Sequence, residues 1–100
     1  MSPAEVIQEN HTLVVVPEQP SLSRRVAAKV VKLAQHFSSD ILFSAGAIHI
    51  DAKSTLMAFI LLDALKGRSM ELSARGVDSA LAVRDLSALF QEKEISGEAA

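Results

Sequence analysis

A run rich in β-branched residues, His11 to Val16, stops at two prolines and gives way at once to an apolar stripe. Such a run predicts a buried strand, and the prolines predict a loop after it. Within residues 26–37 the apolar positions recur at helical spacing, and Ser21 and Ser23 stand where serines cap the start of a helix. The first unit of the chain is therefore a strand, a loop and a helix.

The rest of the chain alternates between strand and helix patterns in the same way. The predicted elements are two short apolar strands around a turn at Gly46, a second helix from Ser54 or Thr55 to Lys66-Gly67, an alternating strand over residues 69–74, and a third helix from Asp78, its N-cap, to Phe90. This order favours an α+β domain in which a layer of helices covers one face of an antiparallel sheet.

Length and composition limit the classes of protein. One hundred residues, 49% of them apolar, suffice for one domain with one core, which we expect over residues 11–91 between flexible segments 1–10 and 92–100. The absence of cysteine excludes a disulfide framework and suits the cytoplasm. A net charge of −2 argues against nucleic-acid binding, and the longest apolar run, residues 56–62, is too short for membrane insertion.

The segment Ser21-Leu22-Ser23-Arg24-Arg25-Val26-Ala27-Ala28 resembles the Gly-Leu-His-Thr-Arg-Pro-Ala-Ala motif of HPr, the phosphocarrier of the bacterial sugar phosphotransferase system. The resemblance covers roughly Thr12 to Phe90 and includes the Lys53-Ser54 and Lys66-Gly67 dipeptides. It implies the HPr-like open-faced β-sandwich, a four-stranded antiparallel sheet with three helices on one face.

Ser23 stands where the family has its phosphorylated histidine, and Arg25 matches the arginine that helps to hold the phosphate. The resemblance therefore implies an anion-binding site at Ser23 and Arg25, without the nucleophile. A serine hydroxyl is a weak nucleophile without a nearby base, and its phosphate ester is a poor phosphoryl donor, so carriage through Ser23 is not expected. The alternative is that Ser23 simply caps the helix. Val26 replaces the proline of the motif.

A second family site is the serine at the start of the second helix, which HPr kinase phosphorylates in some bacteria. Reading forward from the Lys-Ser dipeptide places Ser54 on this site, whereas counting back from Lys66-Gly67 places Thr55 there. We favour Ser54 because Lys-Ser is the family dipeptide. The alternative is a helix cap without regulation.

Residues 56–62 are apolar all round, although a helix on a sheet needs only one apolar stripe. In the family this helix docks partner proteins. We expect Met57 and Ile60 to form an exposed patch while three residues face inward: Leu56, Phe59 and Leu62. A homodimer contact is the alternative.

Four cations, Arg24, Arg25, Lys29 and Lys32, lie within nine residues beside this helix. They form either a solvated face or a basic rim that steers an acidic protein partner, and we favour the rim. We therefore include Arg24 with Met57 and Ile60 among the partner-binding residues.

The three histidines, His11, His36 and His49, lie outside the loop before Ala27 and lack metal-ligand spacing. Since the sequence offers no nucleophile with a base and no phosphate-binding glycine loop, we expect neither an enzyme nor a cofactor. The resemblance favours a regulatory or adaptor domain, with enzyme I, HPr kinase or a transcriptional repressor as partners. The alternatives are a working phosphocarrier with an atypical site and a dimeric structural module.

Overall fold

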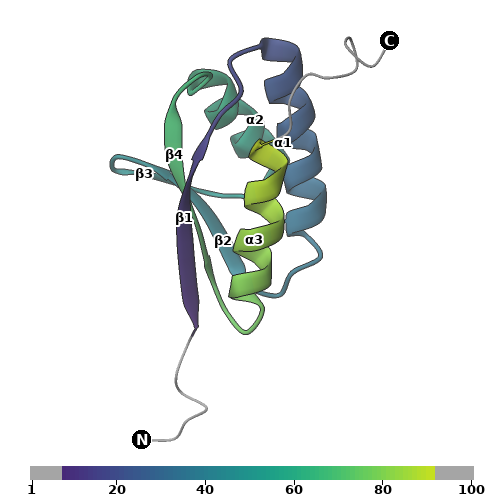
Figure 1. The fold of residues 1–100 in the computed structure, drawn as a ribbon, viewed down its shortest axis with the longest axis vertical. Coiled ribbons are helices and arrows are strands. Elements are labelled where there is room, and N and C mark those ends of the chain that lie inside the picture. Colours follow the sequence, from purple (N-terminus) through teal and green to yellow (C-terminus); the bar gives the residue numbers. More distant parts are fainter. Residues whose placement is uncertain (1–7, 92–100) are drawn as a thin grey trace, which may run out of the picture.

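The computed structural model of the chain describes residues 8–91, which form four strands and three helices (Figure 1). In chain order these are β1 (Glu9–Val15), α1 (Pro20–Ala34), β2 (Asp40–Ala45), β3 (Ile48–Asp51), α2 (Thr55–Ala64), β4 (Ser69–Arg75) and α3 (Ser79–Phe90). This order confirms the order predicted from the sequence. Within residues 8–91 no helix is both long enough and apolar enough to cross a membrane.

The four strands form one antiparallel sheet in the order β1-β4-β2-β3. One row across the sheet joins Thr12, Leu72, Phe43 and Ile50, since Leu72 pairs with both Thr12 and Phe43. Side chains in one row point to the same face of a sheet. Because Leu72 and Phe43 are fully buried, this face forms one half of the core.

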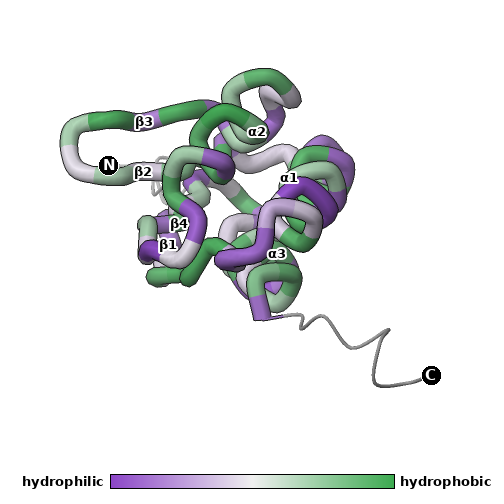
Figure 2. The backbone as a smooth tube through the Cα atoms, turned by 90° about the horizontal axis from the view of Figure 1, so that it is seen from above, coloured by the Kyte–Doolittle hydropathy of each residue, from purple (hydrophilic) through white to green (hydrophobic). Residues whose placement is uncertain are grey.

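All three helices lie on that face, as Figure 2 shows from above. Val30 of α1 is fully buried, and the ring of Phe90 in α3 meets that of Phe43 edge to face, with centroids 5.8 Å apart. The opposite face leaves Leu13 and Val15 of β1 exposed. The fold is therefore an open-faced sandwich of one helical layer on one sheet, as the sequence predicted.

The first strand begins two residues earlier than expected. β1 starts at Glu9, so the expected flexible segment 1–10 overlaps the strand at Glu9 and Asn10. Asn10 is held further by a hydrogen bond from its side-chain amide to the Ser79 hydroxyl at 2.9 Å. Gln8, just before the strand, accepts a hydrogen bond at its carbonyl from the Gly76 amide at 2.8 Å, and residues 1–7 and 92–100 lie outside the described residues.

Asp78 occupies the N-cap position of α3, as predicted, but its carboxylate makes no capping bond to that helix. Its oxygens instead accept hydrogen bonds from the amides of Ser38 and Ser39, each at 2.9 Å, and both serine hydroxyls also donate to it. The bond from the Ser39 hydroxyl is the largest of the effects that lower the pKa of Asp78 to about 2. The carboxylate therefore ties the start of α3 to the loop that enters β2.

Candidate functional site

Helix α1 begins earlier than the sequence predicted, so Ser23 lies inside the helix rather than at its cap. Gln19 is the N-cap residue and Pro20 the first helical residue, so the prediction that Ser21 or Ser23 caps this helix is wrong. Proline favours the first helical position because its φ is already helical and it has no N–H to satisfy. Ser23 is thus the fourth helical residue, and its amide donates to the Gln19 carbonyl at 2.9 Å. That amide is bonded within the helix and is not available to hold an anion.

The side chain of Ser23 points into the protein. Its hydroxyl donates to the backbone carbonyl of Leu62 in α2 at 3.4 Å, and the residue is only 2% exposed. Val26, at the proline position of the motif, is fully buried. The hydroxyl at the position of the motif histidine therefore faces α2 and the core rather than the surface.

Arg24 and Arg25 are exposed beside this buried serine. Arg24 lies close enough to Asp63, at the end of α2, to help lower the pKa of that carboxyl, although the hydrogen bond from Lys66 is the main cause. Lys66 Nζ lies 2.8 Å from Asp63 Oδ1. Of the expected anion-binding pair, only Arg25 is at the surface, and the neighbouring surface carries charges of both signs.

Ser54 and Thr55 occupy different positions at the start of α2. Ser54 is the N-cap residue, and its hydroxyl accepts a hydrogen bond from the amide of Met57 at 3.4 Å. Thr55 is the first helical residue and is exposed. Ser54 is half-buried, so the sequence prediction that one of these two residues caps the helix is confirmed for Ser54.

The backbone just before Ser54 is fixed against the end of α1. Lys53 Nζ donates to the carbonyl of Phe37 at 2.8 Å, and the Lys53 carbonyl accepts from Gln35 Nε2 at 3.4 Å. The Lys53 amide donates to Asp51 Oδ1 at 2.9 Å. The start of α2 is therefore held by the end of α1, while its other end receives the Ser23 hydroxyl.

The exposed apolar patch on α2 contains three residues: Leu56, Met57 and Ile60, which are 68%, 42% and 53% exposed. The prediction that Leu56 faces inward is wrong, whereas Leu62 is fully buried and Phe59 packs against the core as expected. The helix instead turns Ala58 and Leu61 inward together with Leu62. Ala58, Leu61 and Leu62 are spaced three and four positions apart and share one face of the helix, whereas Leu56 is two positions from Ala58 and lies outside that face.

Each histidine lies away from Ser23. His11 and His49 project from the open face of the sheet, where His11 Nδ1 lies 3.5 Å from Glu71 Oε2 and His49 Nδ1 lies 2.7 Å from Ser44 Oγ. His36 follows the other end of α1. Among residues 8–91 no three His, Cys, Asp or Glu side chains are placed to hold a metal ion.

The candidate residues are thus arranged along α2. Ser23 and Arg24 lie at its carboxyl end, Met57 and Ile60 lie on its exposed side, and Ser54 lies at its start. A helix of this length, Thr55–Ala64, spans about 15 Å. The three regions therefore follow one another along a single short helix.

The fold and this arrangement define the class of protein: a small open-faced α+β domain whose candidate residues lie on its first two helices. The family described as "PTS HPr component phosphorylation site" matches residues 11–92, and the chain belongs to this HPr family of the phosphotransferase system. Members of this family are phosphocarriers rather than enzymes.

Solved structures agree with this assignment. The chain is similar to a phosphocarrier protein HPr from Bacillus anthracis str. Ames, at 25% identity and a TM-score of 0.67, over 87% of this chain and 100% of that one. It is also similar to HPr-C-His from Thermoanaerobacter tengcongensis, at 30% identity and a TM-score of 0.65, over 84% of this chain and 98% of that one. A comparison with curated protein sequences gives no match.

Proposed function

We propose that this chain is a regulatory or adaptor member of the HPr family that does not carry phosphoryl groups through Ser23. The observation that supports this proposal is the burial of Ser23, whose hydroxyl donates to Leu62 and whose amide is bonded within α1. A carrier residue must present a nucleophile to its donor and then to its acceptor. Ser23 would have to leave its place against α2 for each transfer.

The chemistry of serine argues in the same direction. An activated serine needs a base within hydrogen-bond reach, and the hydroxyl of Ser23 instead donates to a backbone carbonyl, which cannot take up a proton. Histidine elsewhere does not supply that base, since His11 and His49 lie on the opposite face of the sheet and His36 follows the far end of α1. The domain therefore acts by binding rather than by chemistry of its own.

Ser54 is the residue we assign to regulation by phosphorylation, with Thr55 as the alternative acceptor. The Ser54 oxygen already lies at a helix start, where it accepts from the Met57 amide. A phosphate there would add negative charge at the positive end of the helix dipole, which is a favourable placement. Phosphorylation would therefore change the charge beside Met57 without unfolding α2.

The partner of this surface would be a protein of the phosphotransferase or catabolite-repression type: enzyme I, HPr kinase or a transcriptional repressor. The patch of Leu56, Met57 and Ile60 offers apolar contact area, and Arg24 offers a cation at its edge. Exposed apolar surface rimmed by charge is typical of protein interfaces. Such partners place the chain in the cytoplasm.

The regulatory part of the proposal is tested by incubating the full chain with HPr kinase and ATP and measuring its intact mass. We expect the mass of one added phosphate in the parent chain and in the matched control Thr55→Ala, and none in Ser54→Ala. Phosphate that persists in Ser54→Ala but is lost in Thr55→Ala would move the site to Thr55. No phosphate in any of the three would contradict regulation by this kinase.

The dimeric alternative rests on the same apolar patch and is tested separately. Sedimentation of the parent chain at increasing concentration should give a monomer, because we assign the patch to a different protein. A dimer that is lost in Ile60→Gln would instead assign the patch to self-association.

A further inference from the structure

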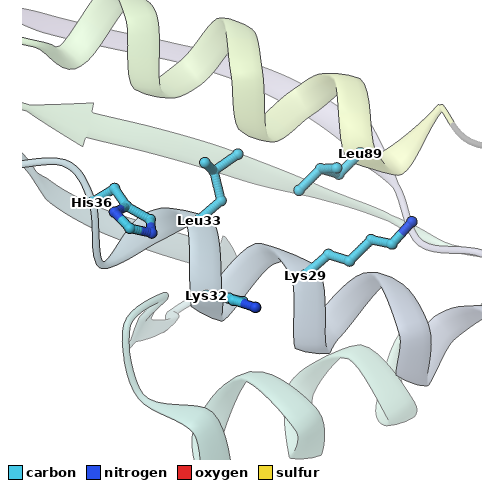
Figure 3. A pocket seen from close by; sticks show the side chains of 5 residues that line it. All are labelled: Lys29, Lys32, Leu33, His36 and Leu89. Atoms are coloured by element: carbon cyan, nitrogen blue, oxygen red, sulfur yellow. The ribbon is translucent and has the colours of Figure 1, made fainter.

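A groove of about 340 Å³ lies between α1 and α3, away from the apolar patch on α2 (Figure 3). Leu33 of α1 and Leu89 of α3 point into the space between the two helices, and Lys29, Lys32 and His36 line its α1 side. The groove therefore has an apolar floor and a basic rim. Its lining selects for a segment that carries both an apolar side chain and carboxylates.

We propose that this groove is the docking site of the chain's own residues 92–100. The segment follows α3 directly, and Leu89, which lines the groove, lies only three residues before Glu92. The chain therefore leaves the described domain from one end of the groove.

The composition of this segment matches the groove. Residues 92–100 contain three glutamates, Glu92, Glu94 and Glu98, against one lysine, and one large apolar residue, Ile95. The carboxylates complement the Lys29 and Lys32 ammonium groups, while Ile95 is matched to the Leu33 and Leu89 floor. No other stretch of the chain outside the described residues has three acidic side chains.

The length of the segment is sufficient. The α1 side of the groove runs from Lys29 to His36, about 10 Å along the helix axis. Nine extended residues reach about 30 Å, so the segment can leave Leu89 and turn back along the groove. Because the segment is covalently attached, its effective concentration at the groove is on the order of millimolar, and weak contacts suffice to hold it.

Docking has a consequence for partner binding. Lys29 and Lys32 belong to the basic face of α1, which we expect to steer acidic partners. Residues 92–100, when docked, would cover this part of the face and compete with an acidic partner for it. The segment would leave the apolar patch on α2 open, since that patch lies on a different helix.

Paramagnetic broadening tests the proposal in the full chain. The chain has no cysteine, so Ser96→Cys carries a single spin label, and Ala47→Cys, in the turn between β2 and β3, is the matched control. We expect the label at residue 96 to broaden the amide signals of Leu33 and His36, at the far end of the groove, and the label at residue 47 to leave them sharp. Replacing Glu92, Glu94 and Glu98 together with glutamine should remove most of this broadening, as should 1 M salt, where charges are screened beyond about 3 Å.

Three results would overturn the proposal. Broadening confined to the last turn of α3 would mean that the segment does not enter the groove. Broadening at His36 that is unchanged in the glutamine variant and at high salt would mean that charge does not hold the segment. Broadening at Leu33 and His36 of isotopic chains that carry no spin label, when spin-labelled chains without isotope are added, would assign the groove to the segment of a second copy. The amide spectrum of each variant reports whether residues 8–91 remain folded.

Discussion

The Ser23 hydroxyl and the Leu62 carbonyl lie 3.4 Å apart and join the first turn of α1 to the last turns of α2. In the motif that Ser23 interrupts, this position carries the phosphorylated histidine. Here it contributes to the contact between two helices, and its residue is 2% exposed. In this structure the position is therefore part of the packed contact between α1 and α2.

Substitutions at Ser23 should lower the free energy of unfolding, and a larger side chain should lower it more than a smaller one. Ser23→Ala removes one long hydrogen bond and should lower the free energy of unfolding by about 1 kcal/mol or less. Ser23→His introduces a larger side chain into a closed space and should lower it by about 1–3 kcal/mol. Urea denaturation measures both. A histidine variant as stable as the parent would show that the larger side chain is accommodated at no cost, which would contradict the close packing around Ser23.

Removing the N-cap side chain of α2, Ser54, should lower the free energy of unfolding more than removing the side chain of the neighbouring Thr55. Ser54→Ala removes the acceptor for the Met57 amide and should cost about 0.5–2 kcal/mol of stability. Thr55→Ala is the matched control and should change stability little, because Thr55 is exposed in the first helical position. Ser54→Asp should retain most of the stability, since aspartate also caps helices. Equal losses in Ser54→Ala and Thr55→Ala would contradict this assignment of the cap.

The Asp78 carboxylate should make stability depend on pH in the acid range. Its pKa is about 2 in the folded chain against 3.8 for the ordinary group, so the unfolded chain binds the proton more readily. The contribution of Asp78 to stability is therefore fully present above about pH 5 and is lost as pH falls towards about 2.

Urea midpoints across this pH range test the Asp78 prediction. Asp78→Asn should be less stable than the parent near neutral pH, and the difference should shrink as the solution becomes acid. Asp85→Asn, which removes only a surface pair with Arg84, is the control and should show a smaller difference. A difference between parent and Asp78→Asn that stays constant with pH would refute the role given to the ionised carboxylate.

Gly76 should tolerate substitution worse than Gly46. At Gly76, where φ is +149°, an added Cβ would lie 2.8 Å from the Ser39 Cα, a contact that requires backbone movement. Gly46 has a φ of +62° and open space around it, so Gly46→Ala should cost only about 1–2 kcal/mol of conformational strain. Thermal denaturation should therefore show a larger drop in melting temperature for Gly76→Ala. The reverse order would contradict the close approach of Gly76 to Ser39.

The order of elements could be predicted from the sequence because each carries a local signal. The β-branched run of β1 and the helical period of α1 follow from nearby residues. The start of α1 could not be placed from the sequence, because Ser21 and Ser23 are typical N-cap residues whereas Pro20 is typical of the first helical position. In the structure the helix begins at Pro20.

The candidate site was less predictable, since it depends on how helices pack. Residues 56–62 are all apolar, so their pattern does not show which side of α2 is buried, and the helix buries Ala58 and Leu61 while leaving Leu56 exposed. The use of Asp78 as a bridge to Ser38 and Ser39 joins residues about forty positions apart along the chain. An aspartate after a glycine turn predicts a hydrogen bond to its own nearby backbone, so the sequence does not indicate a bond to a distant loop.

The central claim is that this member of the HPr family does not accept a phosphoryl group from enzyme I, and intact mass tests it most directly. The full chain is incubated with enzyme I and phosphoenolpyruvate, with a histidine-bearing HPr as the positive control, and the mass is read without acid treatment. The account predicts an unchanged mass for this chain and one added phosphate for the control. An added phosphate on this chain would contradict the account, and its loss in Ser23→Ala would identify Ser23 as a carrier.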